Sequence, residues 1–386
     1  MATKKPTTAI VSRSFWPDNP AIGEALLLLA ESLGKQSDSL VITQVSKSFP
    51  KLLEKSDRGK NIIFSTLPSL TDSSSPIVLR IGELLLFTGF TFASLAWHRP
   101  DQVYVATNPP VFTPLAVRWY CGIFNKKYIY HLQDIHPEIT SIVTGKRNIV
   151  TQLISYIDTK TITKASSIIT LTEQMKSYIN KRAQRDLPIK LLPNPSVQGI
   201  GSEIKTNRIK GFVYCGNAGR LQRIPLLIDA IKKYLDEGGK LPFVFAGAGI
   251  FKEDIKQLAD AYQNVTYKGV LSAQDASRLL HKYSFGLMPI EDEVTNYAFP
   301  SKSSSYVFSG CEVIAICGEN TSVASWVRDN KLGYVVEPET EALVNLFNKL
   351  EKLPLSEPAI NFSFFEKLTP AYHAKALEEI LKQISA

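Results

Sequence analysis

The alternation of short apolar runs with longer segments of helical periodicity constrains this chain more than any other feature. In the first half, runs such as residues 8–13 and 61–67 alternate with segments such as 21–35, in which apolar residues recur every three or four positions. The short runs are typical of buried strands, and the longer segments are typical of amphipathic helices. Strands and helices in alternation predict a parallel sheet with helices on both faces.

The same alternation starts again in the second half, after an aperiodic polar stretch, residues 194–210, that we interpret as a linker. The chain has 386 residues, which is more than one hydrophobic core usually serves. We therefore predict an α/β fold with two doubly wound, Rossmann-like parallel-sheet domains, residues 1–196 and 205–365, followed by a final helix, residues 366–386. Because such sheets bind ligands at the carboxyl ends of their strands, two facing sheets would form a binding cleft.

The excess of basic residues narrows the choice of partner. Lysine and arginine number 44, and aspartate and glutamate number 36, so the formal net charge is +8. This charge favours nucleic acid, a phosphorylated small molecule or an acidic membrane surface. The basic residues are spread along the chain without an arginine-rich stripe among aromatics, which argues against nucleic acid. The four cysteines lack Cys-x-x-Cys spacing, so we expect reduced thiols in a cytosolic protein and no metal.

Residues 73–100 are the stretch that raises the question of a membrane. The apolar part of this segment, residues 84–97, is shorter than the roughly 20 residues that a spanning helix needs. Our first interpretation is a mostly buried helix, and the alternative is a helix that touches the surface of a membrane. We do not expect this segment to span a bilayer.

The clearest chemical signal is the sequence YCGNAGRLQRIPLLIDAI. A predicted strand ends at Gly216, Asn217 and Gly219, and Arg220 and Arg223 precede the next predicted helix. Glycines let backbone N–H groups approach a phosphate, a helix N-terminus carries partial positive charge, and arginines add charge-assisted contacts. We predict a diphosphate site here, and the alternative is a tight turn with solvated arginines.

Other turns in the second half carry glycines or polar side chains. The turns at 245–250 and 267–275 follow predicted strands, and they either contact a ligand or only connect elements. Glu291 follows another predicted strand, and Ser301 and Lys302 begin the helix after it. A cation and hydroxyl groups at a helix start suit a phosphorylated polyol, whereas ordinary N-capping beside a solvated acidic loop is the alternative.

The sequence YIYHLQDIHPE carries a dense cluster of polar residues in the first half. His131, Gln133, Asp134, His136 and Glu138 lie at the end of a predicted strand, where the first sheet would open onto the cleft. Histidine and carboxylate side chains can take a proton from a hydroxyl group. For each histidine, a strand-end or capping hydrogen bond is the alternative to a catalytic role.

Nine sequence blocks together resemble one enzyme family. In chain order they are SFWPDNPAIGEALLLLAESL, PDQVYVATNPPVFTPLA, YHLQDIHPE, LTEQM, LLPNPSV, YCGNAGRLQRIPLLIDAI, FAGAG, NVTYKGVLSAQD and FPSKSSSYVFSGCEVIAI. Their order and spacing resemble those of the retaining, nucleotide-sugar glycosyltransferases of group 1, or family 4, which have the GT-B fold. The chain is most similar to members that build bacterial surface polysaccharides.

The resemblance implies an enzyme that transfers a sugar from a nucleotide sugar to a hydroxyl of a lipid-linked saccharide. It implies that the first domain binds the acceptor, that the second binds the donor, and that the final helix crosses back to the first domain. No cofactor or metal is implied beyond the nucleotide-sugar co-substrate. The expected location is the cytoplasm, peripherally on the inner face of the plasma membrane, with an anionic membrane surface as a partner.

The resemblance also implies roles for individual residues, by position. Donor-binding roles fall on Gly23, Gly216, Asn217, Gly219, Arg220, Arg223, Val270, Leu271, Glu291, Ser301 and Lys302. Acceptor-side roles fall on Gln133, Glu138 and Glu173. The catalytic candidates are His131, Asp134 and His136. A histidine of the family aligns with either His131 or Gln133.

Two departures from the family pattern leave the chemistry open. The family's Glu-x7-Glu pair falls on Tyr297 and Ser305, and residues 310–313 read Gly-Cys-Glu-Val where relatives have Gly-Lys-Pro-Val or similar. Glu291 and Glu293 are the candidates to replace the missing carboxylates. The alternatives are a degenerate GT-B protein that binds a nucleotide sugar without transfer, an epimerase-type GT-B enzyme, and an altered stereochemical course.

Overall fold

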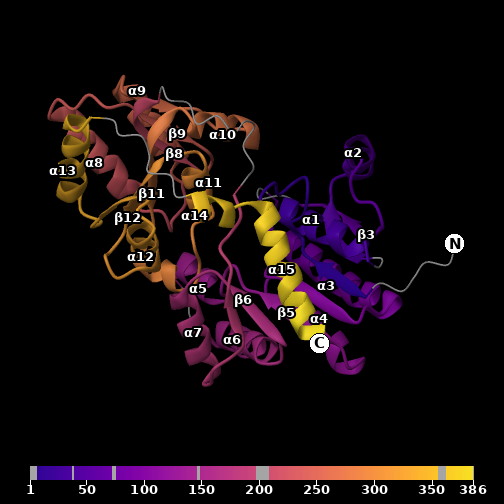
Figure 1. Ribbon diagram of the computed structural model, residues 1–386. Helices are drawn as coiled ribbons and strands as arrows, with labels where there is room; N and C mark the ends of the chain where they lie inside the picture. The colour runs from indigo at the N-terminus through magenta and orange to yellow at the C-terminus, as the bar shows by residue number, and fades with distance from the viewer. Residues whose placement is uncertain are drawn as a thin grey trace. The chain divides into compact units, whose positions relative to one another are not determined.

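The structure is a computed structural model that describes residues 7–36, 39–71, 75–145, 148–196, 208–354 and 362–385. The chain forms two compact units (Figure 1). Unit 1 comprises Met1–Pro195 and Pro370–Ala386, and unit 2 comprises Ser196–Thr369. Most of the predicted linker, residues 197–207, lies outside the described residues. Each unit contains a parallel sheet with surrounding helices, which confirms the predicted α/β fold class.

Unit 1 has a seven-stranded parallel sheet in the order β3-β2-β1-β4-β5-β6-β7. The strands are β1 Thr8–Val11, β2 Ser39–Val45, β3 Ile62–Pro68, β4 Gln102–Ala106, β5 Lys127–His131, β6 Ser167–Thr170 and β7 Ile189–Leu191. The helices are α1 Ile22–Gly34, α2 Phe49–Ser56, α3 Ile77–His98, α4 Phe112–Ile123, α5 Glu138–Thr144, α6 Ile149–Ile162, α7 Glu173–Ala183 and α15 Pro370–Ser385. The central strands are buried along nearly their whole length, which matches their continuous apolar runs.

The strand order in unit 1 decides which helices share a face of the sheet. From β1 the chain adds β2 and then β3 on one side of the sheet. It then crosses to the other side of β1, where it adds β4, β5 and β6 in turn. Because crossovers between parallel strands are right-handed, α1 and α2 cover one face, and α3, α4 and α6 cover the other. Contacts between neighbouring helices agree, since α3 packs against α4, and α4 packs against α6. The final helix α15 belongs to unit 1 and packs against α1.

The expectation that residues 84–97 form a mostly buried helix is wrong. α3 has 22 residues, and the buried ones are Glu83, Phe87, Thr91, Ser94 and Leu95. Only 22% of its most apolar 18-residue window is buried. Among the described residues, α3 is the helix whose length and apolar character would suffice to cross a membrane. The narrow strip that faces the sheet is partly polar, so most of the apolar side chains of α3 point outward.

Unit 2 has a six-stranded parallel sheet in the order β10-β9-β8-β11-β12-β13. The strands are β8 Ile209–Cys215, β9 Phe243–Ala246, β10 Val265–Tyr267, β11 Tyr283–Pro289, β12 Glu312–Ile316 and β13 Gly333–Val336. The helices are α8 Ile224–Asp236, α9 Lys252–Ala261, α10 Ala273–Leu280, the 3-10 helix η1 Asp292–Asn296, α11 Lys302–Phe308, α12 Ser322–Asp329, α13 Thr340–Lys352 and α14 Phe362–Lys367. The core contains a cluster of aromatic rings, in which Phe212 stacks on Phe243 with centroids 4.7 Å apart.

Candidate functional site

Two glycine-rich turns pack backbone against backbone at the carboxyl ends of β8 and β9. The N–H of Gly216 donates to the carbonyl of Ala246 (2.9 Å), and the N–H of Ala218 donates to the carbonyl of Ala248 (2.7 Å). A Cβ atom on Gly247, whose φ is +131°, would lie 2.0 Å from the carbonyl oxygen of Gly216. Only glycine fits this contact. The turn after β8 therefore has a fixed shape beside the N-terminus of α8, an arrangement suited to binding an anion.

These turns lie where the strand order of unit 2 reverses. β8 leads to β9 and β10 on one side, whereas β11 leads to β12 and β13 on the other. Open parallel sheets bind ligands at such a reversal. The loops after β8 and β11 are joined there, because the N–H of Glu291 donates to the carbonyl of Leu221 (3.0 Å). Arg220 is exposed within the first of these loops.

Lys302 places an ammonium group beneath the turn after β8. Its Nζ atom is buried and has no hydrogen-bond partner among the described residues. The Nζ atom lies 3.9 Å from the centroid of the Tyr214 ring, and a Cβ on Gly216 would be 3.9 Å from it. Burial lowers the pKa of Lys302 to about 7, and nearby Cys215 opposes this shift. Burying a cation without an anionic partner costs free energy. A ligand that brings a negative charge to this position would offset that cost.

Tyr306 fixes the helix that carries Lys302 against β8 and β11. The two residues are four positions apart on α11, so they lie on the same face of the helix. The hydroxyl of Tyr306 accepts from the N–H of Cys215 (3.1 Å) and donates to the carbonyl of Leu287 (3.0 Å), which bridges β8 and β11. A Cβ on Gly286 would lie 2.7 Å from the tyrosine ring, so the strand needs glycine at this point. The sequence analysis missed Tyr306, and its i+4 spacing from Lys302 is the signal that could have found it.

Arg223 has a different role from the predicted one. Its guanidinium donates to the carbonyl of Ile290 (2.9 Å) and to Asp292 (2.9 Å), and it lies 3.2 Å from a carboxylate oxygen of Glu291. Asp292 also accepts from the N–H of Gly318 (2.9 Å). Arg223 therefore fastens the acidic loop after β11 to the start of α8. These contacts give Arg223 and Glu291 a part in positioning this loop, and the donor-binding roles predicted for Arg220, Arg223 and Glu291 stay predictions.

The other predicted donor-binding residues of unit 2 surround the same turn. Asn217 is exposed, and the N–H of Gly219 donates to the side chain of Gln222 (3.0 Å). Val270 is 75% exposed in the loop after β10, and that loop is tied to the glycine-rich turns because the carbonyl of Gly269 accepts from the N–H of Gly247 (2.7 Å). The structure thus brings three loops together at one edge of the sheet.

The remaining predicted residues of this region lie in the loop before α10 and around the start of α11. Leu271 is half-buried, and Ser301 is exposed at the start of the helix. The side chain of Ser301 makes no capping hydrogen bond, which weakens the alternative that it only caps the helix. Tyr297 is buried and Ser305 is half-buried. No carboxylate stands at either position of the family's glutamate pair.

In unit 1 the strand order reverses between β1 and β4. The loops after these strands are joined there, because the N–H of Arg13 donates to the carbonyl of Asn108 (2.9 Å). Gly23 is buried behind the first loop, and a Cβ on it would lie 2.5 Å from the backbone of Phe15 and Trp16. Gly23 therefore allows α1 to pack against this loop. Its predicted place near donor phosphates stays a prediction.

The polar cluster after β5 divides into exposed and buried residues. Asp134 is exposed, and the surrounding protein desolvates its carboxyl group enough to raise its pKa to about 6. Gln133 is half-buried and donates to Asn194 (3.0 Å). His136 is half-buried and shares a hydrogen bond with Thr140 (3.1 Å). Burial lowers the pKa of His136 to about 4, so the imidazole is neutral at pH 7.

His131 lies inside the core of unit 1. Its side chain is fully buried, its Nδ1 atom is 2.6 Å from the hydroxyl of Tyr104, and its ring stacks on His373 of α15 with centroids 5.6 Å apart. Burial and the nearby His373 lower the pKa of His131 far below its usual value. The structure gives His131 a packing role rather than the predicted catalytic one. Asp134 and His136 remain the catalytic candidates.

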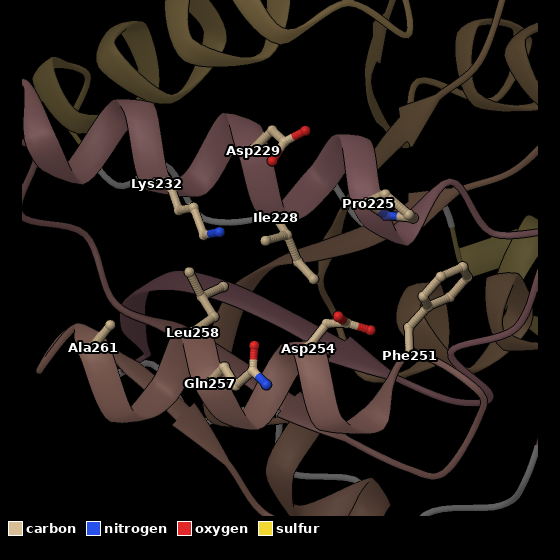
Figure 2. Close-up of a pocket in the computed structure, with 9 residues that line it drawn as sticks. All are labelled: Pro225, Ile228, Asp229, Lys232, Phe251, Asp254, Gln257, Leu258 and Ala261. Carbon is tan, nitrogen blue, oxygen red and sulfur yellow. The ribbon is translucent and has the colours of Figure 1, made fainter.

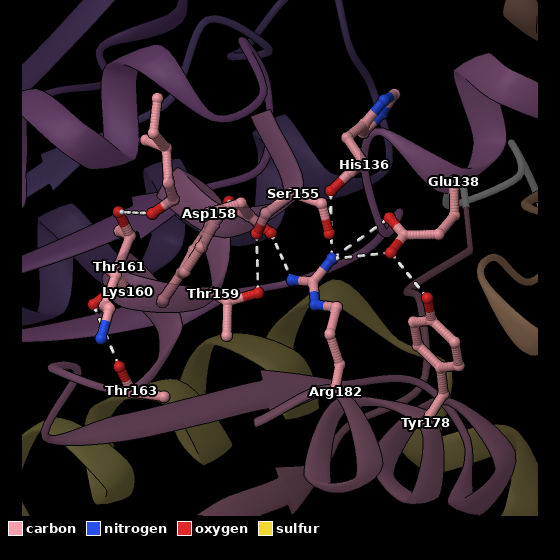
Figure 3. Close-up of polar contacts among 12 residues, drawn as sticks. His136, Glu138, Ser155, Asp158, Thr159, Lys160, Thr161, Thr163, Tyr178 and Arg182 are labelled. Atoms are coloured by element: carbon pink, nitrogen blue, oxygen red, sulfur yellow. Dashed lines mark hydrogen bonds and ion pairs between the residues drawn. The ribbon is translucent and has the colours of Figure 1, made fainter. Parts of the chain in front are cut away.

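Glu138 belongs to a buried ion-pair cluster and not to an open surface (Figure 3). Arg182 of α7 donates to Glu138 (3.0 Å) and to Asp158 of α6 (2.5 Å). Tyr178 also donates to Glu138 (2.6 Å), and Tyr130 donates to Asp158 (3.0 Å). We therefore correct the predicted acceptor-side role of Glu138 to a structural one. The sequence analysis missed Arg182, because its partners are 44 and 24 positions away.

Glu173 is the last of the predicted residues. It is exposed at the start of α7, and its carboxylate pairs with Lys176 at the surface (3.2 Å). Thr172 caps this helix by accepting from the N–H of Met175 (3.1 Å). An exposed carboxylate at a helix start stabilises the helix dipole, so this position does not by itself indicate acceptor binding.

A separate groove of about 300 Å³ lies between α8 and α9 on the outer side of unit 2 (Figure 2). Its lining residues are Pro225, Ile228, Asp229, Lys232, Phe251, Asp254, Gln257, Leu258 and Ala261. None of the predicted site residues lines this groove. Within the described ranges, no group of three or more metal-ligating side chains is placed to hold a metal ion.

Comparisons with known proteins find glycosyltransferases of similar sequence or similar fold. Residues 209–352 match the family described as "Glycosyl transferases group 1". The "Probable glycosyltransferase WbjE" of Pseudomonas aeruginosa is 22% identical over 301 residues, which cover 72% of this chain and 74% of that protein. The structure of HepE from Anabaena in complex with UDP is similar over 96% of this chain and 94% of that chain, with a TM-score of 0.59 and 16% identity. WaaG, a glycosyltransferase involved in lipopolysaccharide biosynthesis, is similar over 96% and 95%, with a TM-score of 0.60 and 14% identity.

Proposed function

We propose that this chain is a glycosyltransferase in which unit 2 binds a nucleotide sugar and unit 1 binds a saccharide acceptor. The match of residues 209–352 to the group 1 family and the similarity of nearly the whole chain to solved GT-B structures support this proposal. The transferred sugar leaves its diphosphate and is bonded to an acceptor hydroxyl. The similarity to WbjE and WaaG favours a step in the synthesis of a bacterial surface polysaccharide. The proposed location is the cytoplasmic side of the cell envelope.

The buried ammonium of Lys302 carries this proposal. It lies beside the turn after β8, without a hydrogen-bond partner among the described residues, in a position suited to the diphosphate of a donor. As the bond between the anomeric carbon and the diphosphate breaks, the leaving group gains negative charge. Lys302, Arg220 and the N-terminus of α8 would stabilise that charge. Fixed cations at the diphosphate make a metal ion unnecessary, so we expect the rate to be unchanged by EDTA.

Asp134 is our candidate for contact with the acceptor hydroxyl. It is the exposed carboxylate of the cluster after β5, and its raised pKa suits a group that receives a proton near neutral pH. The acceptor oxygen forms a bond to the anomeric carbon, and its proton passes to Asp134 or to the leaving phosphate. We propose retention of configuration because of the resemblance to retaining enzymes. The anomeric configuration of the product, read by NMR coupling constants, tests this course.

Thermal-shift measurements with a panel of nucleoside diphosphates and nucleotide sugars test the donor site first. A ligand at 100 times its Kd stabilises the folded state by about 2.7 kcal/mol, which raises the melting temperature measurably. The stabilising nucleotide sugar is then offered with saccharide acceptors, and the glycosylated product is detected by mass spectrometry. A panel without any stabilising nucleotide would contradict the proposal.

A protein that binds a donor without transferring the sugar is the second candidate. It is favoured by Tyr297 and Ser305, which leave both positions of the family's glutamate pair without a carboxylate. Stabilisation by a nucleotide sugar, without product formation or donor hydrolysis for any acceptor, would support this candidate. Release of a free 2-epimeric sugar would instead indicate the epimerase-type enzyme.

The depressed pKa of Lys302 predicts that donor binding takes up a proton. In the free protein this amine is neutral above pH 7, whereas a bound diphosphate favours the charged form and raises its pKa. Affinity should therefore fall as the pH rises above 7, by up to about tenfold per unit. Calorimetry of UDP or the identified donor at pH 8, in buffers of different ionisation enthalpy, should show an uptake approaching one proton per site. Equal apparent enthalpies in all buffers would contradict this prediction.

Arg220→Ala is expected to weaken donor binding while leaving the fold intact. Loss of one charge-assisted phosphate contact costs about 2–3 kcal/mol, or roughly 30–150-fold in affinity. The exposed Arg278, which pairs with Asp275 on α10, offers a matched control, and Arg278→Ala should change affinity by less than twofold. If turnover of Arg220→Ala with the true donor stays within twofold of the wild type, the phosphate assignment is wrong.

A further inference from the structure

The outer surface of α3, α4 and α6 is unusually apolar. Twenty large apolar side chains are exposed among the described residues, of which seven lie on α3, two on α4 and four on α6. They include Leu85, Trp97, Trp119, Ile123 and Leu153. We call this surface the three-helix face. These helices cover the same side of the sheet, and each packs against the next, so their exposed side chains lie on the same side of unit 1. Such concentrations mark interaction sites.

The charges of the three-helix face identify its partner. These helices contain two carboxylates, and both point inward: Glu83 pairs with Arg13, and Asp158 pairs with Arg182. The basic side chains of the helices are instead accessible, because Arg80 and Lys160 are exposed and Arg118 is half-buried. An apolar surface with accessible positive charge and buried negative charge complements a bilayer that contains anionic lipids.

Buried contacts argue that α3 lies on a bilayer and does not cross it. Glu83 accepts from Arg13 (2.9 Å), from Gln44 (3.0 Å) and from the N–H of Leu70 (2.7 Å), and it also accepts from Thr71. These contacts tie α3 to β2 and to the loops after β1 and β3. Crossing a membrane would break all of them and leave a carboxylate in the hydrocarbon region, which is costly.

The start of α3 lies at the functional edge of the sheet. α3 follows β3, so its first turns are at the carboxyl edge, where Asp134 follows β5. Six of the seven exposed apolar side chains of α3 lie in its first ten residues, from Ile77 to Leu86. The most apolar part of the face is therefore next to the edge at which an acceptor is expected.

We propose that the three-helix face docks onto the surface of a bilayer that contains anionic lipids and holds the carboxyl edge of unit 1 at the height of membrane-anchored acceptors. The docking step depends only on this face. The presentation of an acceptor depends, in addition, on the proposed function.

Vesicle flotation of the full chain tests the docking step. We expect the wild type to bind phosphatidylcholine vesicles with 30% phosphatidylglycerol, and to bind pure phosphatidylcholine vesicles at least tenfold more weakly. Leu85→Ser/Leu153→Ser should lower the partition coefficient at least tenfold. The matched control is Ile250→Ser/Leu353→Ser, two exposed positions in unit 2 that should bind like the wild type. Arg80→Gln/Lys160→Gln should remove most of the preference for anionic vesicles. Wild-type binding by both the serine and the glutamine variants would overturn the proposal.

Tryptophan quenching by brominated lipid locates the bound surface. Trp97 and Trp119 lie on the three-helix face, whereas Trp326 lies in unit 2. We expect brominated lipid to quench the fluorescence of the wild type and of Trp326→Phe to a similar extent. The fluorescence of Trp97→Phe and of Trp119→Phe should be quenched less. Sedimentation without lipid examines the alternative that this face joins two copies of the chain. A dimer that Leu85→Ser/Leu153→Ser dissociates, combined with no vesicle binding, would overturn the proposal.

Activity assays separate the docking step from the proposed function. With a water-soluble acceptor, Leu85→Ser/Leu153→Ser should turn over like the wild type. With an acceptor embedded in vesicles, it should be at least tenfold slower. Failure of every acceptor, with vesicle binding intact, would count against sugar transfer and leave the docking step supported. Equal rates on the embedded acceptor would refute the presentation of acceptors by this face.

Discussion

Lys302→Met is expected to slow sugar transfer by about 10²–10³-fold and, at the same time, to stabilise the ligand-free protein. The two effects have one cause, because the Nζ atom is buried beside the turn after β8 without a hydrogen-bond partner among the described residues. In the free protein the buried amine lowers the free energy of unfolding, because a buried polar group without a partner costs about 1–3 kcal/mol. When a diphosphate is bound, the same group supplies the nearest fixed cation. Loss of one such charge in a preorganised site costs about 10²–10³ in rate.

Chemical denaturation and donor titration measure both halves of this prediction. The free Lys302→Met protein should unfold at a higher denaturant concentration than the wild type, and it should no longer take up a proton with the donor. Lys352→Met, at an exposed lysine at the end of α13, is the matched control and should change neither quantity. A free variant that is less stable than the wild type, or that keeps wild-type turnover, would contradict our assignment of Lys302.

Arg182→Met should destabilise unit 1 by about 3–5 kcal/mol, because it leaves Glu138 and Asp158 buried without their cation. These carboxylates come from α5 and α6, and Arg182 comes from α7, so the variant loosens three helices at once. The free energy of unfolding at pH 7 measures the effect. The carboxylates would need protons to stay buried, so the loss should shrink as the pH is lowered toward 5.

Replacement of the whole cluster provides the control. Arg182→Met combined with Glu138→Gln and Asp158→Asn removes the charges together, and it should recover most of the lost stability, since an uncharged buried cluster costs less than an unpaired one. Arg185→Met, at an exposed position just after α7, should have little effect. If the triple variant is no more stable than Arg182→Met, the cost does not come from unpaired carboxylates.

The sequence predicted the architecture well because periodicity and turn composition are local signals. Runs such as residues 8–13 and 211–216 need only their own residues to identify a buried strand, and the glycines of the turn after β8 identify a close backbone approach. The interpretation of α3 failed for a related reason. An apolar helix normally faces a core, and periodicity alone does not show that the strip facing the sheet consists of Glu83, Thr91 and Ser94 together with two apolar residues.

Individual site residues were harder to predict, because their roles depend on partners that are distant in the sequence. Arg223 looks available for a phosphate until Asp292 is placed beside it. Glu138 looks like an acceptor ligand until Arg182 arrives from α7, and His131 looks catalytic until His373 of the last helix covers it. The sequence identified Lys302 as a basic group at the start of a helix, and the structure places it beside the turn after β8. Its burial could not be read from the sequence, because the ring that its ammonium group faces, Tyr214, is 88 positions away.

The last helix has a consequence for how the protein is made. Ala374, Leu377, Ile380 and Leu381 of α15 belong to the core that β1 and α1 begin, although all of unit 2 is translated between them. During translation, the core of unit 1 therefore stays incomplete until the final residues have been made. Unit 2, which is encoded between the two parts of unit 1, can finish folding earlier. A chain that stops before Pro370 would leave this core open, and quality-control proteases would be expected to recognise unit 1 first.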